Sequence, residues 1–262
     1  MTIDGGGGTD AAILNDAGVA RTDTYTITSS TVSRPLFGGL TYSRLASLTL
    51  NGESGTSTAV SNIYNINSTA AGTSYKINGG GGNDTFNLSP TSSAGLDALQ
   101  GPVTINGGGG SNTLDYSAWV GNVLVNLPLG TATGVAGGIS NIQNVTGSIG
   151  NDILVGDANA NVLVGGTGRN LIIGEGGPDQ LFGGGDNILI GGTTAYDQNL
   201  TALDAIMAEF TRTDQNFHQR VSAIMIGGGF NGAFVLNTAT LFDDGATNVL
   251  TGGGGLDWPS PT

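Results

Sequence analysis

A nine-residue repeat over residues 147–192 limits the folds open to this chain more than any other feature. The segment divides into GSIGNDILV, GDANANVLV, GGTGRNLII and GEGGPDQLF, then the shortened unit GGGDNILI and a final GG. The sixth position of each full unit is Asp or Asn, and the eighth is Leu or Ile. One unit is too short to bury its own apolar residue, so the units must stack to share a core.

Each unit reads as a glycine-rich turn followed by a strand of three residues. The middle residue of such a strand points inward while its two neighbours point outward. Stacked units would therefore bury one apolar column, made of Leu154, Leu163, Ile172, Leu181 and Leu189. Glycine is abundant, at 48 of 262 residues, because short regular turns need its backbone freedom.

A looser repeat of the same kind occurs outside this segment. The matching stretches are INGGGGNDTFNL (77–88), INGGGGSNTLDY (105–116), IDGGGGTD (3–10) and LTGGGGLD (250–257). Runs of β-branched residues such as DTYTITSSTV and LASLTLNG lie between the glycine turns and have strand composition. These features predict coils that are longer and less regular than the nonapeptide coils.

The nonapeptides resemble the GGxGxDxUx unit of the RTX (repeats-in-toxin) family of bacterial secreted and surface proteins. The resemblance implies an all-β solenoid: a right-handed parallel β-helix that continues into an RTX-like β-roll. It also implies calcium ions between the turns, bound by sixth-position side chains and turn carbonyls. Two units would make one coil, so Asp152, Asn170 and Asn187 would line one edge, and Asn161 and Asp179 the other.

Further candidate calcium ligands lie in or beside the turns, namely Asp157, Asp186, Asn83 and Asp84. Asn replaces the family's sixth-position Asp at Asn161, Asn170 and Asn187. Asn offers a carbonyl oxygen without charge, and calcium affinity depends on the number of charged ligands. We therefore expect weaker sites than all-Asp turns would form. The alternative is an asparagine ladder, in which stacked amides hydrogen-bond along the coils without metal.

The net charge of the chain limits the classes of partner that it can bind. Twenty acidic residues oppose seven basic ones, which gives a net charge of −13. This balance excludes a nucleic-acid partner, because little is present to neutralise phosphates. No apolar run is long enough for membrane insertion, and the chain has no cysteine. Hard divalent cations, which prefer oxygen ligands, are the natural partner for the excess charge.

Residues 199–226 break the repeat pattern. Leu203, Ile206, Met207 and Phe210 have helical spacing, and Phe217, Val221 and Ile224 repeat it. We expect two short amphipathic helices, the first capped by Asn199 or Thr201. They either cover an apolar patch of the roll or form a face for a partner. The expected organisation is a β-helix over 1–146, a β-roll over 147–198, this helical insert, and strands with a glycine-rich turn over 227–262.

The residue inventory argues against an enzyme. His218 is the only histidine, cysteine is absent, and no G-x-S-x-G motif occurs. We expect a calcium-binding structural repeat protein that is secreted, extracellular or held at the cell surface. Head-to-tail self-assembly through the solenoid ends into a homo-polymer filament is a further hypothesis. The alternative is an adhesion or glycan-binding module of a larger surface protein.

Overall fold

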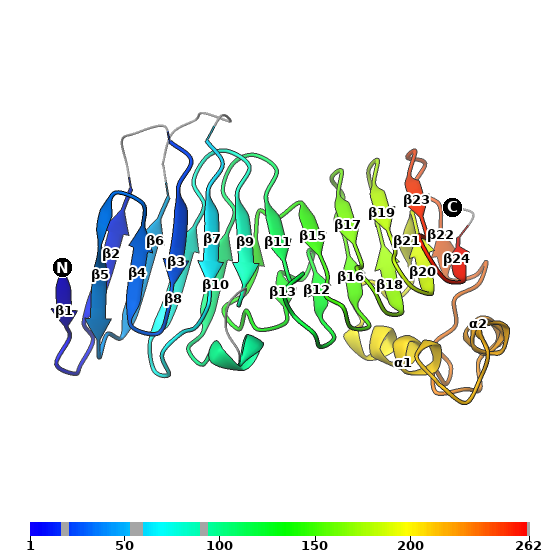
Figure 1. Cartoon of the computed structure of the whole chain (residues 1–262). Coiled ribbons are helices and arrows are strands. Elements are labelled where there is room, and N and C mark those ends of the chain that lie inside the picture. The colour runs from blue at the N-terminus through cyan, green and yellow to red at the C-terminus, as the bar shows by residue number, and fades with distance from the viewer. Residues whose placement is uncertain (17–20, 53–59, 90–93, 261–262) are drawn as a thin grey trace. The chain divides into compact units, whose positions relative to one another are not determined.

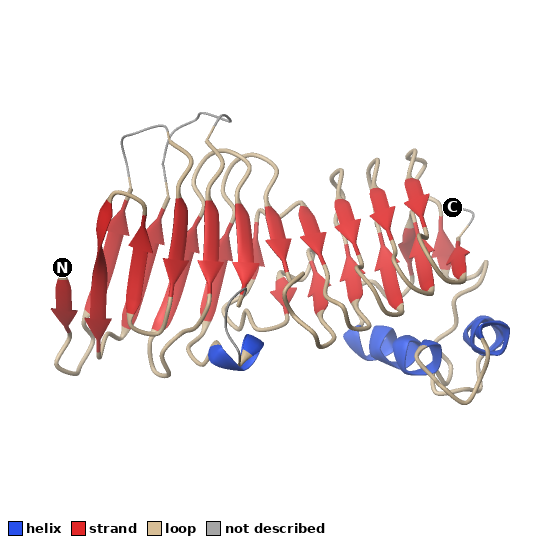
Figure 2. Ribbon diagram, viewed as in Figure 1, coloured by secondary structure: helices blue, strands red, loops and turns tan. Residues whose placement is uncertain are grey.

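The computed structural model describes residues 1–16, 21–52, 60–89 and 94–260 (Figures 1 and 2). The chain forms two compact units. Unit 1 contains residues 1–119 and 130–144, and unit 2 contains residues 120–129 and 145–262. Both units are built mostly from short strands that stack in parallel.

Unit 1 contains two sheets. The first has the spatial order β1 (Thr2–Asp4), β5 (Phe37–Ser43), β4 (Thr31–Arg34), β3 (Thr24–Ile27), β7 (Ile63–Ile66), β9 (Thr85–Leu88), β11 (Thr113–Asp115). The second has the order β14 (Ile139–Ser140), β10 (Val103–Asn106), β8 (Ser74–Asn78), β6 (Ser47–Asn51), β2 (Ala11–Asn15). Unit 1 also holds β13 (Thr131–Ala132) and a short 3-10 helix, η1 (Gly95–Ala98).

The strand register in unit 1 places like residues above one another. Tyr25 pairs with Tyr64, and Tyr64 with Phe86, in the parallel ladder β3-β7-β9. Their rings stack inside the coils with centroids 4.9 Å apart at each step. All three side chains are buried. The alternation of buried and outward residues in these strands is the pattern expected of coils wrapped around one core.

Unit 2 contains the nonapeptide coils. One sheet runs β12 (Leu124–Asn126), β16 (Ile153–Val155), β18 (Asn170–Ile173), β20 (Asn187–Ile190), β24 (Asp257–Pro259). A second runs β17 (Val162–Val164), β19 (Gln180–Phe182), β23 (Val249–Thr251). A small antiparallel pair joins β21 (Thr193–Thr194) to β22 (Leu241–Phe242), and β15 (Asn144–Thr146) lies at the start of the main part of unit 2.

Successive nonapeptides alternate between these two sheets. Leu154 pairs with Ile172, two units further on, and Leu163 pairs with Leu181. Two nonapeptides therefore complete one coil. The five eighth-position residues are almost completely buried, at 0–1% exposed, and form the inward column that the repeat predicts.

Two helices follow the nonapeptides, α1 (Leu200–Phe210) and α2 (Phe217–Ile226). The side chain of Asn199 caps α1 by accepting from the N–H of Ala202. Leu203, Ile206 and Phe210 of α1 join one hydrophobic cluster with the outward residues of β16, β18 and β20. These three strands are consequently buried on both faces, whereas β17 keeps outward residues only partly buried.

Candidate metal centre

The turns of unit 2 form two columns, one before the strands of each sheet. We call the first turn edge the turns 147–152, 165–170, 183–187 and 252–257, which precede β16, β18, β20 and β24. The second turn edge consists of the turns 156–161, 174–179 and 243–248, which precede β17, β19 and β23. Asp152, Asn170 and Asn187 thus stand on the first edge, and Asn161 and Asp179 on the second.

Sixth-position side chains join each coil to the next. The backbone N–H of Asp152 donates to Asn170 Oδ1 at 2.9 Å, and Asn170 Nδ2 donates to Asn187 Oδ1 at 2.9 Å. On the second edge the N–H of Asn161 donates to Asp179 Oδ1 at 2.9 Å. The N–H of Asp179 in turn donates to Asn248 Oδ1 at 2.8 Å. All four residues whose N–H or amide donates in these bonds are buried.

Asp84 occupies the same place in a ladder that runs through unit 1. Each member's backbone N–H donates to the side-chain oxygen of the next, over distances of 2.7–3.0 Å. The members are Asp23, Asn62, Asp84, Asn112 and Gln143. Sequence reasoning found only Asp84, because the separations of 39, 22, 28 and 31 residues have no fixed period.

The remaining candidates have other partners. Asn83 is exposed, and its Oδ1 accepts from the N–H of Ser111 at 2.8 Å. Asp157 Oδ1 accepts from the N–H of Asn159 at 2.8 Å, on the second edge. Asp186 forms ion pairs with two arginines on the first edge. These three side chains therefore lie beside the sixth-position ladders rather than in them.

The first glycine of each turn makes room for the sixth-position side chain. A Cβ added to Gly174 would come closer than 3.0 Å to both Asp179 Oδ2 and the carbonyl oxygen of Gly191. The same collision arises at Gly79, with Asp84 Oδ2 and the carbonyl oxygen of Gly107. The aspartate oxygen and the next coil's carbonyl oxygen thus border the same small space, which only glycine leaves open.

Asn and Asp behave differently in that space. Asn112 Nδ2 donates to the carbonyl of Asn141 at 2.9 Å, and Asn187 Nδ2 donates to the carbonyl of Gly252 at 3.1 Å. A carboxylate has no proton to donate, and Oδ2 of Asp84 and of Asp179 has no hydrogen-bond partner in the described structure. A buried carboxylate oxygen without a hydrogen-bond donor is unfavourable unless it is protonated or contacts a cation.

Asp152 is the exception among the sixth-position aspartates. Its Oδ2 accepts from the backbone N–H of Ser148 at 2.6 Å, and its Oδ1 accepts from the Ser148 hydroxyl at 2.9 Å. Ser148 stands at the second position of its turn, where the GGxGxDxUx unit has glycine. Local donors therefore satisfy this carboxylate without a metal ion.

Burial and neighbouring charge raise the pKa of the unpartnered carboxyls. Burial raises the pKa of Asp84 to about 6. Burial, and then the charges of Asp244 and Asp157, raise the pKa of Asp179 to about 7. Burial also raises the pKa of Glu175, in the same turn, to about 7, with a further contribution from Asp197. The second edge therefore concentrates negative charge that nothing in its own turns neutralises.

The donor set at Asp179 suits calcium. Calcium takes several oxygen ligands, including carboxylates and backbone carbonyls, in flexible geometry. Within the described residues, no three His, Cys, Asp or Glu side chains form a group that could hold a metal. An ion at Asp179 or Asp84 would therefore draw most of its ligands from turn carbonyls, such as those of Gly191 and Gly107.

The family comparison agrees with this geometry. The model of the RTX calcium-binding nonapeptide repeat matches residues 76–89, 96–118, 146–181 and 164–193. The chain therefore carries RTX calcium-binding nonapeptide repeats, which confirms the resemblance noted in the sequence. The matched segments include all nine candidate ligands. No curated protein matches the chain.

RTX repeats typically bind calcium and are typical of secreted bacterial proteins. The helices in the described part of the chain are too short or too polar to cross a membrane.

The space beside the first glycine can be tested by adding one methyl group. We expect Gly174→Ala to lower the free energy of unfolding by about 1–3 kcal/mol, because the new Cβ overlaps Asp179 Oδ2 and a backbone carbonyl. Gly176→Ala is the matched control, since its Cβ would meet Ala158 at an ordinary 3.5 Å. Urea unfolding should separate the two variants, and equal losses would contradict the packing described.

The raised pKa of Asp179 predicts a pH dependence of stability in the absence of calcium. The folded protein holds this proton more tightly than the unfolded chain, whose Asp has a pKa of 3.8. The stabilisation is therefore complete below about pH 4 and is lost as the pH rises to about 7, by on the order of 2–4 kcal/mol.

Asp179→Asn should flatten this decline, because an amide carries no charge at any of these pH values. Asp204→Asn, at an exposed position of α1, removes the same charge and should leave the decline as it is in the unmodified protein. Thermal unfolding from pH 4 to pH 8 in chelator measures the difference. A parallel decline in all three proteins would show that Asp179 does not set it.

Proposed function

We propose that this chain is a secreted structural repeat protein whose coils are closed by calcium at Asp84 and Asp179. The single observation that supports the proposal most is the pair of buried Oδ2 atoms without partners, each beside the carbonyl oxygen of the next coil. Equivalent asparagines donate a hydrogen bond to that carbonyl. Asp84 and Asp179 would instead hold a cation, which would supply the positive charge that the amide proton supplies at the asparagines.

Each residue of the turn would have a distinct role. Asp179 Oδ1 holds the N–H of Asn161 and so fixes the carboxylate between coils, which leaves Oδ2 for the ion. The charges of Asp157 and Asp244 raise the local negative potential without joining the sixth-position ladder. Bound calcium supplies the positive charge that offsets this repulsion. Gly174 keeps the space open.

The mixture of Asp and Asn then has a functional meaning. Turns with asparagine, and the turn in which Ser148 serves Asp152, close with hydrogen bonds alone. Turns at Asp84 and Asp179 close fully only when an ion or a proton is present. The protein would thus be partly folded by its own amides and completed by calcium, which is abundant outside cells. The finer architecture that we propose is a right-handed β-helix in unit 1 and a β-roll in unit 2.

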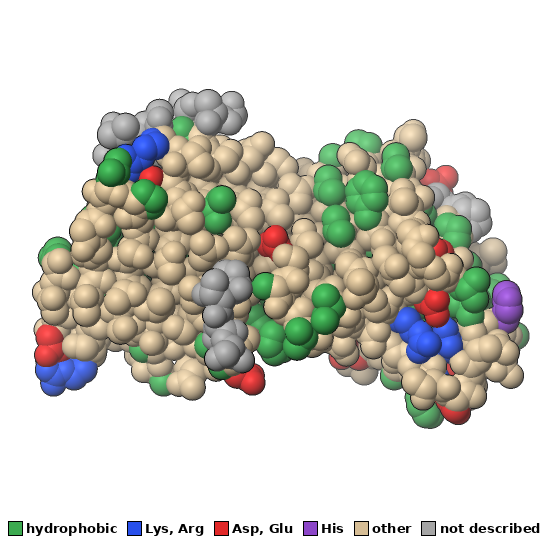
Figure 3. Space-filling model, in the orientation of Figure 1, with side chains coloured by type: hydrophobic (Ala, Val, Ile, Leu, Met, Phe, Trp, Pro, Cys, Tyr) green, Lys and Arg blue, Asp and Glu red, His purple; other side chains and the backbone are tan. Residues whose placement is uncertain are grey.

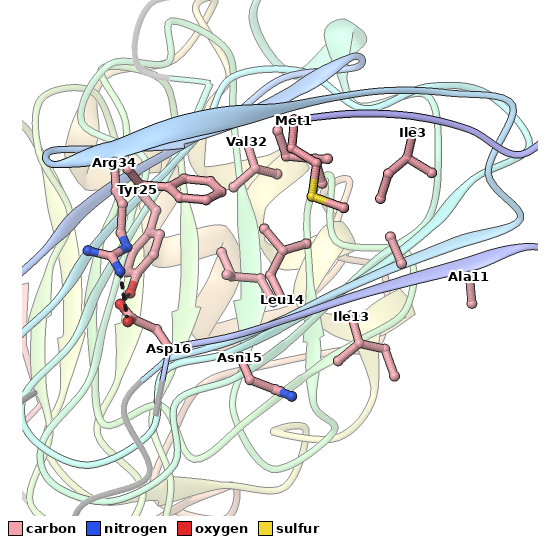
Figure 4. A pocket seen from close by; sticks show the side chains of 14 residues that line it. Met1, Ile3, Ala11, Ile13, Leu14, Asn15, Asp16, Tyr25, Val32 and Arg34 are labelled. Atoms are coloured by element: carbon pink, nitrogen blue, oxygen red, sulfur yellow. Dashed lines mark hydrogen bonds and ion pairs between the residues drawn. The ribbon is translucent and has the colours of Figure 1, made fainter. Parts of the chain in front are cut away.

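An assembly role is supported by a cavity in unit 1. The cavity has a volume of about 350 Å³ and lies between β1 and β2, with Arg34, Tyr25 and Asp16 at one side (Figure 4). Its lining is mostly apolar and includes Ile3, Leu14 and Val32. Among the described strands, β1 pairs only with β5, and β2 only with β6.

We propose that a coil from a second copy of this chain covers the cavity and extends both sheets. Backbone groups on the free sides of β1 and β2 offer hydrogen bonds to such a coil, and the apolar lining offers burial. Repetition of this head-to-tail contact would give a filament. No catalytic step is part of this proposal, and we propose a non-enzymatic role.

Calcium titration tests the proposed ion sites. We expect isothermal titration calorimetry to show calcium binding that is reduced by Asp84→Asn and again by Asp179→Asn, and abolished at these sites in the double variant. Calcium should raise the melting temperature of the unmodified protein, because the ion binds only the stacked turns. Asp204→Asn is the control for lost charge. Full calcium binding by the double variant would overturn the assignment.

Sedimentation velocity tests the assembly. We expect large species at millimolar calcium and high protein concentration, and their loss in Ile3→Glu, which places a charge in the half-buried cavity lining. Ile149→Glu changes an exposed turn residue of unit 2, 53% exposed, and should assemble normally. A monomer under all conditions would remove the filament and leave the calcium sites unaffected.

A further inference from the structure

The first turn edge has a positive centre of its own. Asp186 Oδ2 accepts from Arg220 Nη2 at 3.0 Å and lies 3.4 Å from Arg169 Nε. Asp186 Oδ1 accepts from the N–H of Leu256 at 3.0 Å, in the next turn of the edge. One carboxylate therefore links the turns 165–170, 183–187 and 252–257 to two guanidinium groups.

Arg220 is held firmly in this position. It comes from α2, yet only 3% of its side chain is exposed. Its Nη1 donates to the carbonyl of Gln215 at 2.8 Å, and its guanidinium lies 5.7 Å from the ring centroid of Phe210 and 5.9 Å from that of Phe217. Burying an arginine is costly unless it is paired, so these contacts direct its charge to Asp186.

Arg169 connects the same site to the other helix. Its Nη1 donates to the carbonyls of Thr211 and Arg212, at 3.0 and 3.2 Å, where α1 ends. The carbonyl of Arg212 also accepts from Arg220 Nη1 at 3.5 Å, so both arginines donate to the segment that follows α1. Figure 3 shows basic side chains beside acidic ones over this helical part of unit 2.

The second turn edge has the opposite character. Asp157, Glu175, Asp179 and Asp244 have no ion-pair partner among the residues that the structure describes. Both edges belong to the same coils, and both carry carboxylates at turn positions. They differ because the helices cover the sheet that follows the first edge and bring Arg220 to it.

We infer that Arg169 and Arg220 act as a built-in cation at the first turn edge, where they sit beside the sixth-position ladder and supply the positive charge that calcium would supply at the second edge. This inference rests on the proposed calcium function. The guanidinium groups neutralise Asp186 and join adjacent turns, so these coils close without metal. The helical insert is then a clamp on the turn edge as well as a cover for an apolar sheet.

An ordinary ion pair that merely anchors α2 would look similar in the structure, but it predicts a different response to calcium. Removing an anchor weakens the protein whether or not calcium is present. Removing a substitute cation leaves the Asp186 carboxylate and the carbonyl oxygens of Thr211, Arg212 and Gln215 without the guanidinium groups that contact them. Because those groups are oxygen ligands, calcium should then bind there and restore stability.

The experiment uses the full chain carrying Asp84→Asn and Asp179→Asn, so that the proposed calcium sites are absent. Into this background we would introduce Arg169→Met and Arg220→Met together, which keep much of the apolar stem. We expect a lower melting temperature in chelator, recovery at millimolar calcium, and about one added calcium ion per chain by calorimetry. Asp186→Asn in the same protein should abolish the recovery.

Two further variants keep the test decisive. Arg169→Lys with Arg220→Lys retains the charge and should gain no calcium response, even if it is somewhat less stable. Arg212→Met is the matched control, because Arg212 pairs with Asp214 and Glu209 and not with the turn edge. Loss of stability that calcium does not restore would overturn the inference. A calcium gain in this background, with no calcium response in the unmodified protein, would overturn only the proposed function.

Discussion

Each coil depends on one contact, the folding of a sixth-position side chain over the first glycine of its own turn. The side chain reaches the adjacent coil from there, and its oxygen holds a backbone N–H that would otherwise be buried and unpaired. The contact explains why glycine and Asp or Asn recur five residues apart. It also explains why the turn cannot absorb a Cβ at its first position.

The other terminal atom of that side chain, Nδ2 in Asn or Oδ2 in Asp, then decides how the turn is joined to the next coil. An amide nitrogen donates to the next coil's carbonyl, as at Asn112 and Asn187. A carboxylate cannot, and Asp84 and Asp179 are left with a buried oxygen that attracts a cation or a proton. A change of Asp to Asn therefore alters the charge requirement of a turn while preserving its shape. The two side chains have the same shape here, but Asn presents a hydrogen-bond donor where Asp presents a negatively charged acceptor.

Much of the fold could be predicted from the sequence, because the nonapeptide has a strict period. The parallel coils, the inward column from Leu154 to Leu189 and the cap at Asn199 all follow from local pattern. The unit 1 ladder from Asp23 to Gln143 could not be foreseen, since its coils differ in length and only the fold aligns them. Asn248 was missed for a similar reason, because it follows the helical insert and lies 69 residues after its partner Asp179.

The apolar sequence of several nonapeptide strands is a further pattern, and the structure explains it. The strands ILV, NLII and NILI are buried along their whole length, whereas VLV and QLF have outward residues that are partly buried or exposed. VLV is apolar too, so apolar flanks alone do not tell the two sheets apart. Strands buried on both faces read as continuous apolar runs, and here α1 and α2 provide the second cover. The role of Arg220 left no such signal, because nothing local indicates that a helical arginine will reach a turn 34 residues away.

The two edges together suggest how stability is distributed along the coils. In a solenoid each coil contacts mainly its neighbours, so stability is close to a sum of local terms and interfaces. Coils joined by amides, by Ser148 or by the arginines are complete without an ion and can serve as templates for the others. The turn at Asp179 closes against such a template, and its ion site exists only once its neighbours are in place. If calcium binds at Asp179 as proposed, its binding would be a late step of folding that depends on the coils on either side.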